Sequence, residues 1–194
     1  MSALPDKKWT VEEYLAFERA SQEKHEFFGG EIYLMAGASR AHSLITGNLV
    51  TALNNALGER PCEVHPNDMR VNVSKRDYFY PDIVVVCDEP QVEDDIGDTL
   101  LNPTVIIEVL SPSTEQFDRG KKFQFYRRLT SLREYLLVSQ DTPRIEHYVH
   151  QENDQWLFSD AVGLDAKLTL PALNCELALT DVYRRVSFEP ETGE

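Results

Sequence analysis

Two acidic residues stand in apolar parts of the chain, where an acid is unexpected. Glu108 interrupts the apolar run of residues 105–110, and strand alternation puts it on the same face as Ile106 and Leu110. An ionised carboxylate buried there is costly unless it is paired or bound to a metal ion. Asp82 opens a second run, of β-branched residues. Two such acids on converging strands predict a site for Mg²⁺ or Mn²⁺, which bind carboxylate, water and phosphate oxygens.

A lysine on the following predicted helix could complete this site. Four residues share one helical face by their spacing: Asp118, Lys122, Phe125 and Leu129. Lys122 would then point toward the sheet, near the end of the Glu108 strand, where an ammonium could orient a water molecule or stabilise charge on a phosphate. The competing interpretation is an exposed Asp118–Lys122 ion pair, which would contribute only about 0.3–0.5 kcal/mol. The spacing by itself leaves both interpretations open.

Three helices are expected to position these residues, at residues 10–20, 41–57 and 114–129. Thr10 and Glu13 have the spacing of a capping box at the start of the first helix. Apolar residues recur at helical spacing in the second helix, which a glycine follows directly.

Strands are expected between and after these helices. Those at residues 80–87 and 104–110 are apolar on both faces, which is typical of central strands covered by helices on each side. The order of elements predicts an α/β or α+β domain with a mixed sheet over residues 1–188, followed by a polar tail at 189–194. The other expected strands are a hairpin at 26–35 around two glycines, one or two strands within 63–73, and strands at 135–139, 145–149, 155–159 and 167–170.

The net charge of −14 limits the possible partners. A protein that binds DNA by neutralising phosphates is expected to be basic overall, so this charge argues against strong non-specific DNA binding. The charge is unevenly distributed, however. Residues 119–133 hold six of the basic residues, whereas residues 88–98 hold six acids and are interpreted as a solvated acidic loop.

The cysteines and the apolar runs indicate where the protein resides. Cys62, Cys87 and Cys175 are far apart and odd in number, so we expect reduced, mostly buried thiols and no disulfide. The N-terminus has no apolar stretch of signal-peptide type, and no apolar run approaches the length of a membrane span. These features predict a cytoplasmic protein that does not contact the membrane.

Several segments together resemble one protein family. They are Pro81-Asp82, Gly30-Glu31 and residues 35–42, 107–114, 118–122 and 133–135. In these segments the chain is similar to the Uma-type restriction endonucleases, a family of the PD-(D/E)XK nuclease superfamily. The similarity extends from about residue 9 to residue 182, and the block between Glu108 and Tyr126 is its most specific part.

The resemblance implies a restriction-endonuclease-like αβββαβ core, with an N-terminal helix and hairpin added, a divalent metal ion and phosphodiester hydrolysis. Asp82 and Glu108 match the metal-binding acids of the family. The usual superfamily pattern places a lysine two residues after the glutamate, where this chain has Leu110. The family's own pattern places the lysine on the following helix, and Lys122 matches it. The resemblance therefore favours the catalytic interpretation of Lys122.

Two further residues are candidates for a supporting role. Glu31, with Glu26 as the second choice, could add a carboxylate of the kind that some superfamily members supply from an upstream element. The alternative for Glu31 is a salt-bridged acid beside the glycine turn. His42 matches a position that the family often keeps as histidine, and both a structural role at the start of the helix and a role in the site remain open.

The resemblance thus implies a Mg²⁺-dependent endodeoxyribonuclease with catalytic residues Asp82, Glu108 and Lys122. DNA is the expected substrate, and a homodimer is expected because superfamily nucleases that cut both strands often form one. The alternative is a catalytically inert protein that keeps the nuclease fold as an interaction or regulatory module. Action on RNA or on unusual DNA structures is a third possibility, without support from a known RNA-binding motif.

Overall fold

The computed structural model describes residues 2–3 and 7–188. The polar tail predicted at residues 189–194 lies outside these described residues. None of the helices in the described part is long and apolar enough to cross a membrane.

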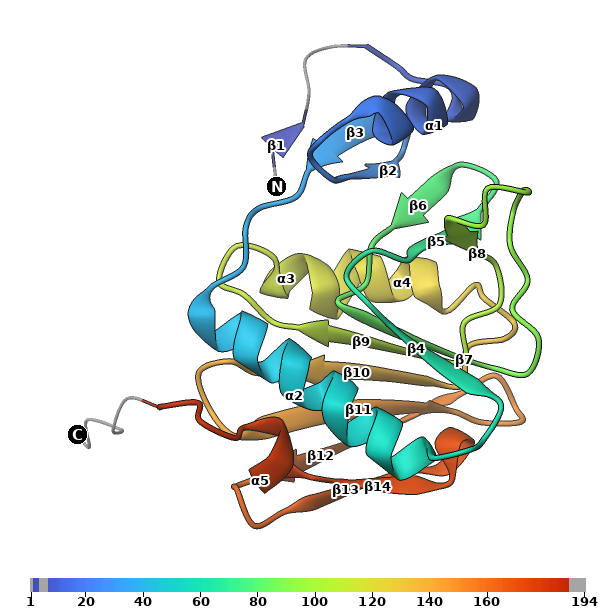
Figure 1. Cartoon of the computed structure of the whole chain (residues 1–194). Coiled ribbons are helices and arrows are strands. Elements are labelled where there is room, and N and C mark those ends of the chain that lie inside the picture. Colours follow the sequence, from blue (N-terminus) through green and yellow to red (C-terminus); the bar gives the residue numbers. More distant parts are fainter. Residues whose placement is uncertain (1, 4–6, 189–194) are drawn as a thin grey trace.

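A six-stranded mixed sheet forms the centre of the molecule (Figure 1). Its order is β12-β11-β10-β9-β7-β4. β9 and β10 are parallel, and every other neighbouring pair is antiparallel. The strands are β4 (Cys62–Pro66), β7 (Ile83–Cys87), β9 (Val105–Val109), β10 (Glu134–Val138), β11 (Arg144–His150) and β12 (Trp156–Val162).

One face of this sheet is covered by α2 (Arg40–Leu57). The helix begins where the Ser39 side chain accepts the His42 N–H, and it ends at Gly58, whose φ of 57° lies in the left-handed region that favours glycine. Its buried residues recur every fourth position and pack on the inward side chains of the sheet: Ile45, Leu49, Leu53 and Leu57. The same core includes β13 (Lys167–Leu170), β14 (Cys175–Ala178) and α5 (Leu179–Val182).

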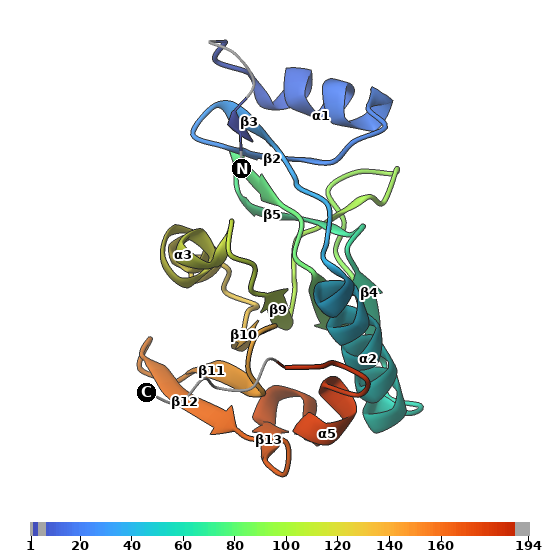
Figure 2. The same cartoon turned by 90° about the vertical axis from the view of Figure 1, so that its left-hand side faces the viewer.

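The opposite face is covered by a helical segment, as Figure 2 shows with α2 and α3 on either side of β9 and β10. This segment consists of α3 (Glu115–Phe117), a π-helical turn (Asp118–Lys122) and α4 (Phe123–Tyr126). The prediction of one regular helix over residues 114–129 is therefore wrong in its middle. Because a π turn is wider than an α turn, Tyr126 rather than Phe125 becomes fully buried after Lys122.

Chain order within the central sheet is α2, β4, β7, β9, α3–α4 and β10. This is the αβββαβ order that the family resemblance implied. β5 and β6 are inserted between β4 and β7, and they belong to a second sheet.

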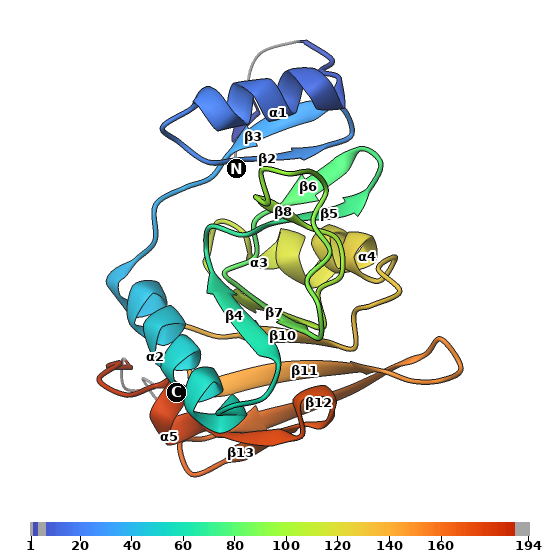
Figure 3. The same cartoon turned by 45° about the vertical axis from the view of Figure 1, so that its right-hand side comes forward.

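The second sheet carries the N-terminal part of the chain, which lies above the core in Figure 3. Its order is β1-β3-β2-β6-β5-β8, with the predicted hairpin as β2 and β3. α1 (Val11–Ala20) packs on it and begins with the predicted capping box of Thr10 and Glu13. The strands are β1 (Ser2–Ala3), β2 (His25–Phe28), β3 (Glu31–Leu34), β5 (Arg70–Ser74), β6 (Asp77–Phe79) and β8 (Thr99–Leu100).

The cysteines differ from the sequence-based expectation. Cys62 and Cys87 form a disulfide, whereas Cys175 is free. β4 and β7 pair in the register that places Cys62 directly opposite Cys87. This pairing depends on two strands that are distant in sequence, so the spacing of the cysteines could not reveal it.

The acidic loop is held by two arginines, so the interpretation as a simple solvated loop is wrong for part of it. Arg70 is 1% exposed, and its guanidinium donates to Asp98 at 2.9 Å and to Thr99 at 2.9 Å. Arg19 of α1 donates to Asp98 at 2.8 Å and to Asp94 at 2.7 Å. The loop thereby ties α1 to β5.

These ion pairs predict an acid-sensitive contribution to stability. The hydrogen bond from Arg19, with the charge of Arg70, lowers the pKa of Asp98 from 3.8 to about 2. A lowered pKa stabilises the folded state above the unfolded pKa, and this stabilisation is lost as the pH falls through the folded pKa. Because Asp98 is partly exposed, we expect Asp98→Asn to lower the free energy of unfolding by about 1–2 kcal/mol at neutral pH.

Urea denaturation at several pH values measures this effect. The difference between Asp98→Asn and the wild type should shrink as the pH falls from about 4 toward 2. Asp95→Asn is the matched control, because Asp95 is an exposed acid of the same loop. An Asp98→Asn effect of equal size at pH 7 and pH 3 would contradict the assignment of this stabilisation to the lowered pKa of Asp98.

Candidate active site

The pairing of β7 with β9 brings two predicted site residues together. Ile83 lies opposite Ile107 in this antiparallel pair, so the next position outward places Asp82 opposite Glu108. Asp82 Oδ2 accepts the backbone N–H of Val109 at 2.7 Å, which fixes its carboxylate against the end of β9. Both residues line one cleft.

Lys122 reaches the same place from the helical segment. Its Nζ lies 2.9 Å from Glu108 Oε1, 2.9 Å from Glu26 Oε1 and 3.6 Å from Asp118 Oδ1. The ammonium and these three carboxylates are buried. The structure therefore excludes the exposed Asp118–Lys122 ion pair and joins Lys122 to Glu108, as the catalytic interpretation requires.

The π turn aims Asp118 and Lys122, its first and last residues, at this cluster. π turns often occur at functional sites, where they re-aim side chains. The Tyr135 hydroxyl of β10 donates to the backbone carbonyl of Asp118 at 3.0 Å, and the Tyr126 hydroxyl donates to Glu108 Oε1 at 2.9 Å. Two buried tyrosines thus fix the turn and the carboxylate that faces it.

The structure does not bring Glu31 to the cluster. Glu31 is partly exposed and is bound by Lys8 at 2.7 Å and by the Tyr33 hydroxyl at 2.7 Å, which matches the salt-bridged turn acid considered as its alternative. Glu26, the second choice, lies in the cluster and is 2% exposed. Its Oε2 is buried and has no hydrogen-bond partner among the described residues.

The sequence contains a weak signal for Glu26. All four residues of β2 are buried, and they alternate between two cores: Phe27 packs under α1, whereas Phe28 packs with the residues of the helical segment. Glu26 shares the Phe28 face. An acid in a fully buried strand is the same kind of exception that identifies Glu108.

His42 lies at the start of α2 and also contacts Asp82. Its backbone N–H donates to Ser39 Oγ at 3.0 Å at the start of α2, and its ring Nε2 lies 3.2 Å from Asp82 Oδ2. Burial would lower the pKa of the ring, but the hydrogen bond and charge of Asp82 outweigh burial and raise it. A protonated His42 would therefore hold the Asp82 carboxylate in place.

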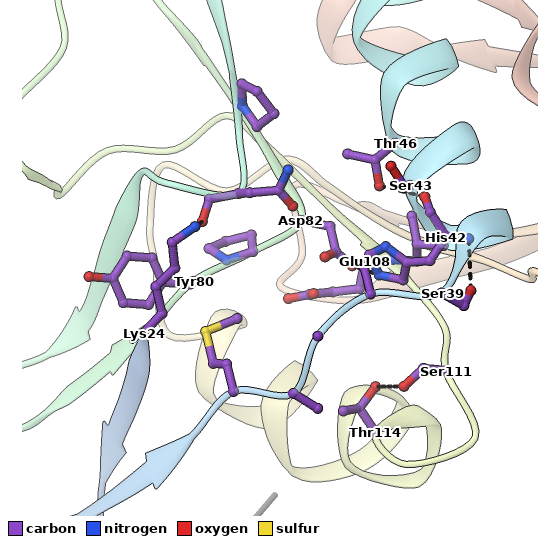
Figure 4. A pocket seen from close by; sticks show the side chains of 18 of the residues that line it. Lys24, Ser39, His42, Ser43, Thr46, Tyr80, Asp82, Glu108, Ser111 and Thr114 are labelled. Atoms are coloured by element: carbon purple, nitrogen blue, oxygen red, sulfur yellow. Dashed lines mark hydrogen bonds and ion pairs between the residues drawn. The ribbon is translucent and has the colours of Figure 1, made fainter. Parts of the chain in front are cut away.

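The cluster forms one wall of a cleft of about 960 Å³. Figure 4 shows Asp82, Glu108 and His42 together at its centre. The segment of residues 35–39, the start of α2, and the loop of residues 111–114 line the rest. In that loop the Ser111 hydroxyl lies 2.9 Å from Thr114 Oγ1. The cleft is large enough for a nucleotide-sized group to reach the carboxylates.

Three carboxyl groups surround a single ammonium group in the cluster. Burial raises the pKa of Glu108 well above its usual range, and burial likewise raises the pKa of Glu26 and of Asp118, in each case against the opposing effect of Lys122. For Lys122, burial alone would lower the pKa, but Glu108 and Glu26 outweigh it and raise the pKa well above its usual range. The ammonium therefore stays charged, while the acids would gain from a further cation.

The donor set fits an oxygen-preferring divalent ion. Among the described residues, no group of three or more His, Cys, Asp or Glu side chains is arranged to hold a metal ion. Mg²⁺ needs fewer protein ligands, because it usually keeps several waters and binds one or two carboxylates together with substrate phosphate. Asp82 and Glu108 can supply two such carboxylates, and Glu26, whose buried Oε2 has no hydrogen-bond partner among the described residues, lines the same cleft.

Relatives of this chain are found in Synechocystis sp. PCC 6803. The uncharacterized protein sll1609 is 41% identical over 160 residues, which cover 82% of this chain and 90% of the relative. The uncharacterized protein slr1290 is 36% identical over 185 residues, which cover 95% of this chain and 96% of the relative.

A solved structure shares the fold. It is the crystal structure of a putative nuclease belonging to DUF820 from Anabaena variabilis, with a TM-score of 0.74 and 20% identity over 90% of this chain and 97% of that chain. The chain thus has the mixed α and β architecture of a nuclease fold. A family model described as "Uma2: Putative restriction endonuclease" matches residues 11–181. This match covers most of the sequence, so the chain belongs to the Uma2 family.

Proposed function

We propose that this protein is a metal-dependent endonuclease that hydrolyses DNA phosphodiester bonds, with Asp82 and Glu108 as metal ligands and Lys122 as the catalytic lysine. The observation that carries the proposal is the convergence of these three groups in one cleft. Lys122 Nζ lies 2.9 Å from Glu108, and Asp82 stands opposite Glu108 across two paired strands. Membership of the Uma2 family supports the same chemistry.

Each side chain has a defined task in this proposal. Asp82 and Glu108 would hold Mg²⁺ or Mn²⁺, which when bound polarises the phosphate and lowers the pKa of a water molecule. The charged Lys122 donates to the phosphate oxygens on which negative charge increases during attack by that water. Glu26 and Asp118 keep Lys122 protonated and oriented, Tyr126 fixes Glu108, and His42 fixes Asp82.

Metal binding is the first property to test. A ligand that binds only the folded state stabilises it, by about 1.4 kcal/mol at ten times its Kd, which corresponds to about 3–6 °C in Tm for a chain of this size. We expect Mg²⁺ or Mn²⁺ to produce this shift in the wild type and in Glu31→Gln, whose side chain lies outside the cluster. Glu108→Gln should lose it.

Thermal denaturation with and without the metal ion measures the shift. An equal response in Glu108→Gln would place the ion elsewhere. No response in the wild type would favour the alternative that the protein is a catalytically inert module with a nuclease fold.

Lys122 is tested by separating its charge from its structural role. Lys122→Met leaves the buried acids without their cation, which can cost several kcal/mol of stability. The double variant Lys122→Met/Glu26→Gln removes one charge of each sign and should recover part of that loss. Cleavage of plasmid DNA should fall by about 10²–10³-fold in both variants, because removing one preorganised donor has effects of this size.

Urea denaturation and single-turnover cleavage measure these two effects separately. Cleavage that returns to the wild-type rate in the double variant would mean that Lys122 acts only in folding. Glu26→Gln by itself is the control for the second substitution.

A homodimer is part of the proposed function, because superfamily nucleases that cut both strands of a duplex often act as homodimers. β12 is an edge strand of the central sheet, and three of its large apolar side chains are exposed: Leu157 (59%), Phe158 (49%) and Val162 (64%). An exposed apolar edge strand favours pairing with another chain. We therefore expect Phe158→Arg to convert a dimer into a monomer in sedimentation experiments, whereas Ile96→Arg, at an exposed apolar residue of the acidic loop, should not.

A further inference from the structure

Five exposed basic residues flank the two ends of α4 or lie in the neighbouring β5–β6 turn, and we call this set the cationic strip. β5 packs against α4, and the β5–β6 hairpin lies above this helix in Figure 1. Arg128 lies 3.8 Å from Asp77, the first residue of β6. The members of the strip are Lys75, Arg76, Lys121, Arg127 and Arg128.

The strip has few acidic partners, although acids outnumber basic residues by 33 to 19 in this chain. Within the described residues, the long Arg128–Asp77 contact is the one ion pair that a member of the strip forms. By contrast, Arg19 and Arg70 are bound by acids at less than 3 Å. In a protein with surplus acids, a group of exposed cations left largely unpaired is available to an external anion.

Aromatic rings hold three of these cations in place. Lys121 lies over Phe28 at 5.3 Å, Arg127 over Phe123 at 5.2 Å and Arg128 over Phe125 at 4.9 Å from the ring centroids. These rings pack in the core cluster beneath the helical segment. Cations seated on fixed rings lose less conformational entropy on binding than free side chains, which favours association with a regularly spaced anion.

We propose that the cationic strip binds the phosphate backbone of duplex DNA and so anchors the substrate beside the catalytic cleft. The choice of DNA as partner rests on the proposed function. Lys121 of the strip directly precedes Lys122, which lines the cleft, so the strip begins beside the cleft. Phosphates follow one another about every 3.4 Å along one DNA strand, so a strand of a few nucleotides can contact the strip and reach the cleft.

The negative charge on the rest of the molecule also favours the approach of DNA from the side of the strip. A net charge of −14 repels DNA from most directions. A local cationic surface then selects the side from which a duplex can approach, because charge complementarity guides encounter and register more than it adds affinity. The binding is expected to be weak and strongly dependent on salt.

The test compares two pairs of adjacent arginines. Arg127→Gln/Arg128→Gln removes two charges from the strip, whereas Arg184→Gln/Arg185→Gln removes two exposed charges just after α5, on the other face of the central sheet. Both variants change the net charge equally. A third variant, Lys75→Gln/Arg76→Gln, removes strip cations without disturbing the Arg128–Asp77 contact.

Binding of a fluorescent DNA duplex is followed by anisotropy in the presence of a chelator, over a range of salt concentrations, so that no cleavage occurs. The slope of log K against log salt should become shallower by about 1.8 in each strip variant, since each phosphate contact contributes about 0.9. The Arg184–Arg185 variant should keep the wild-type slope. Melting curves establish that all variants are folded.

Three outcomes would overturn the inference: no duplex binding by the wild type, strip variants with the wild-type slope, or the same reduction in all three variants. The last would indicate an effect of net charge alone. Strip-dependent binding without cleavage in Mg²⁺ or Mn²⁺ would overturn the proposed nuclease activity and support the binding surface. Cleavage with strip-independent binding would overturn only the surface.

Discussion

The burial of one ammonium group among carboxylates is the interaction on which the rest of the site depends. Lys122 contacts Glu26 of β2, Glu108 of β9 and Asp118 of the π turn. The N-terminal hairpin, the central sheet and the helical segment are therefore joined through a single charge. Because removal of one partner from a buried ion pair leaves an uncompensated charge, these elements cannot shift independently without a large cost.

This cluster is only partly neutralised by its own residues. Burial and mutual repulsion raise the pKa of the enclosed acids, and one oxygen of Glu26 has no partner among the described residues. A core selected only for stability would avoid both features. Raised pKa values and an unpaired buried oxygen are common at functional sites, where some stability is lost in favour of chemistry. A bound cation and substrate would supply the interactions that this cluster lacks.

The sequence predicted the features that depend on local pattern. The inward face of α2 follows from hydrophobic periodicity, and Glu108 is identified because it breaks the apolar pattern of a buried strand. The family resemblance then connected Lys122 with it. These features share one property: each can be recognised within a window of about one element.

The features that were missed depend on contacts between elements distant in sequence. Glu26 and Glu31 flank the same glycine turn, and only the packing of β2 on the core decides that Glu26 is the buried one. The Cys62–Cys87 disulfide depends on the register of β4 against β7. The π turn at Asp118–Lys122 departs from the regular helical spacing that the sequence pattern assumes. Propensity and spacing contain no information about such pairings.

The net charge of the chain is a second property whose meaning for function depends on where the residues lie in the fold. Composition gives a net charge of −14, but seven of the acids are buried, Glu26, Glu108 and Asp118 among them, and the pKa values of these three are raised. Other acids, such as Asp94 and Asp98, are neutralised by arginines within the fold. An approaching polyanion responds to the charges that reach the surface and to their positions. The positions of the surface charges therefore matter more for DNA binding than the formal net charge does.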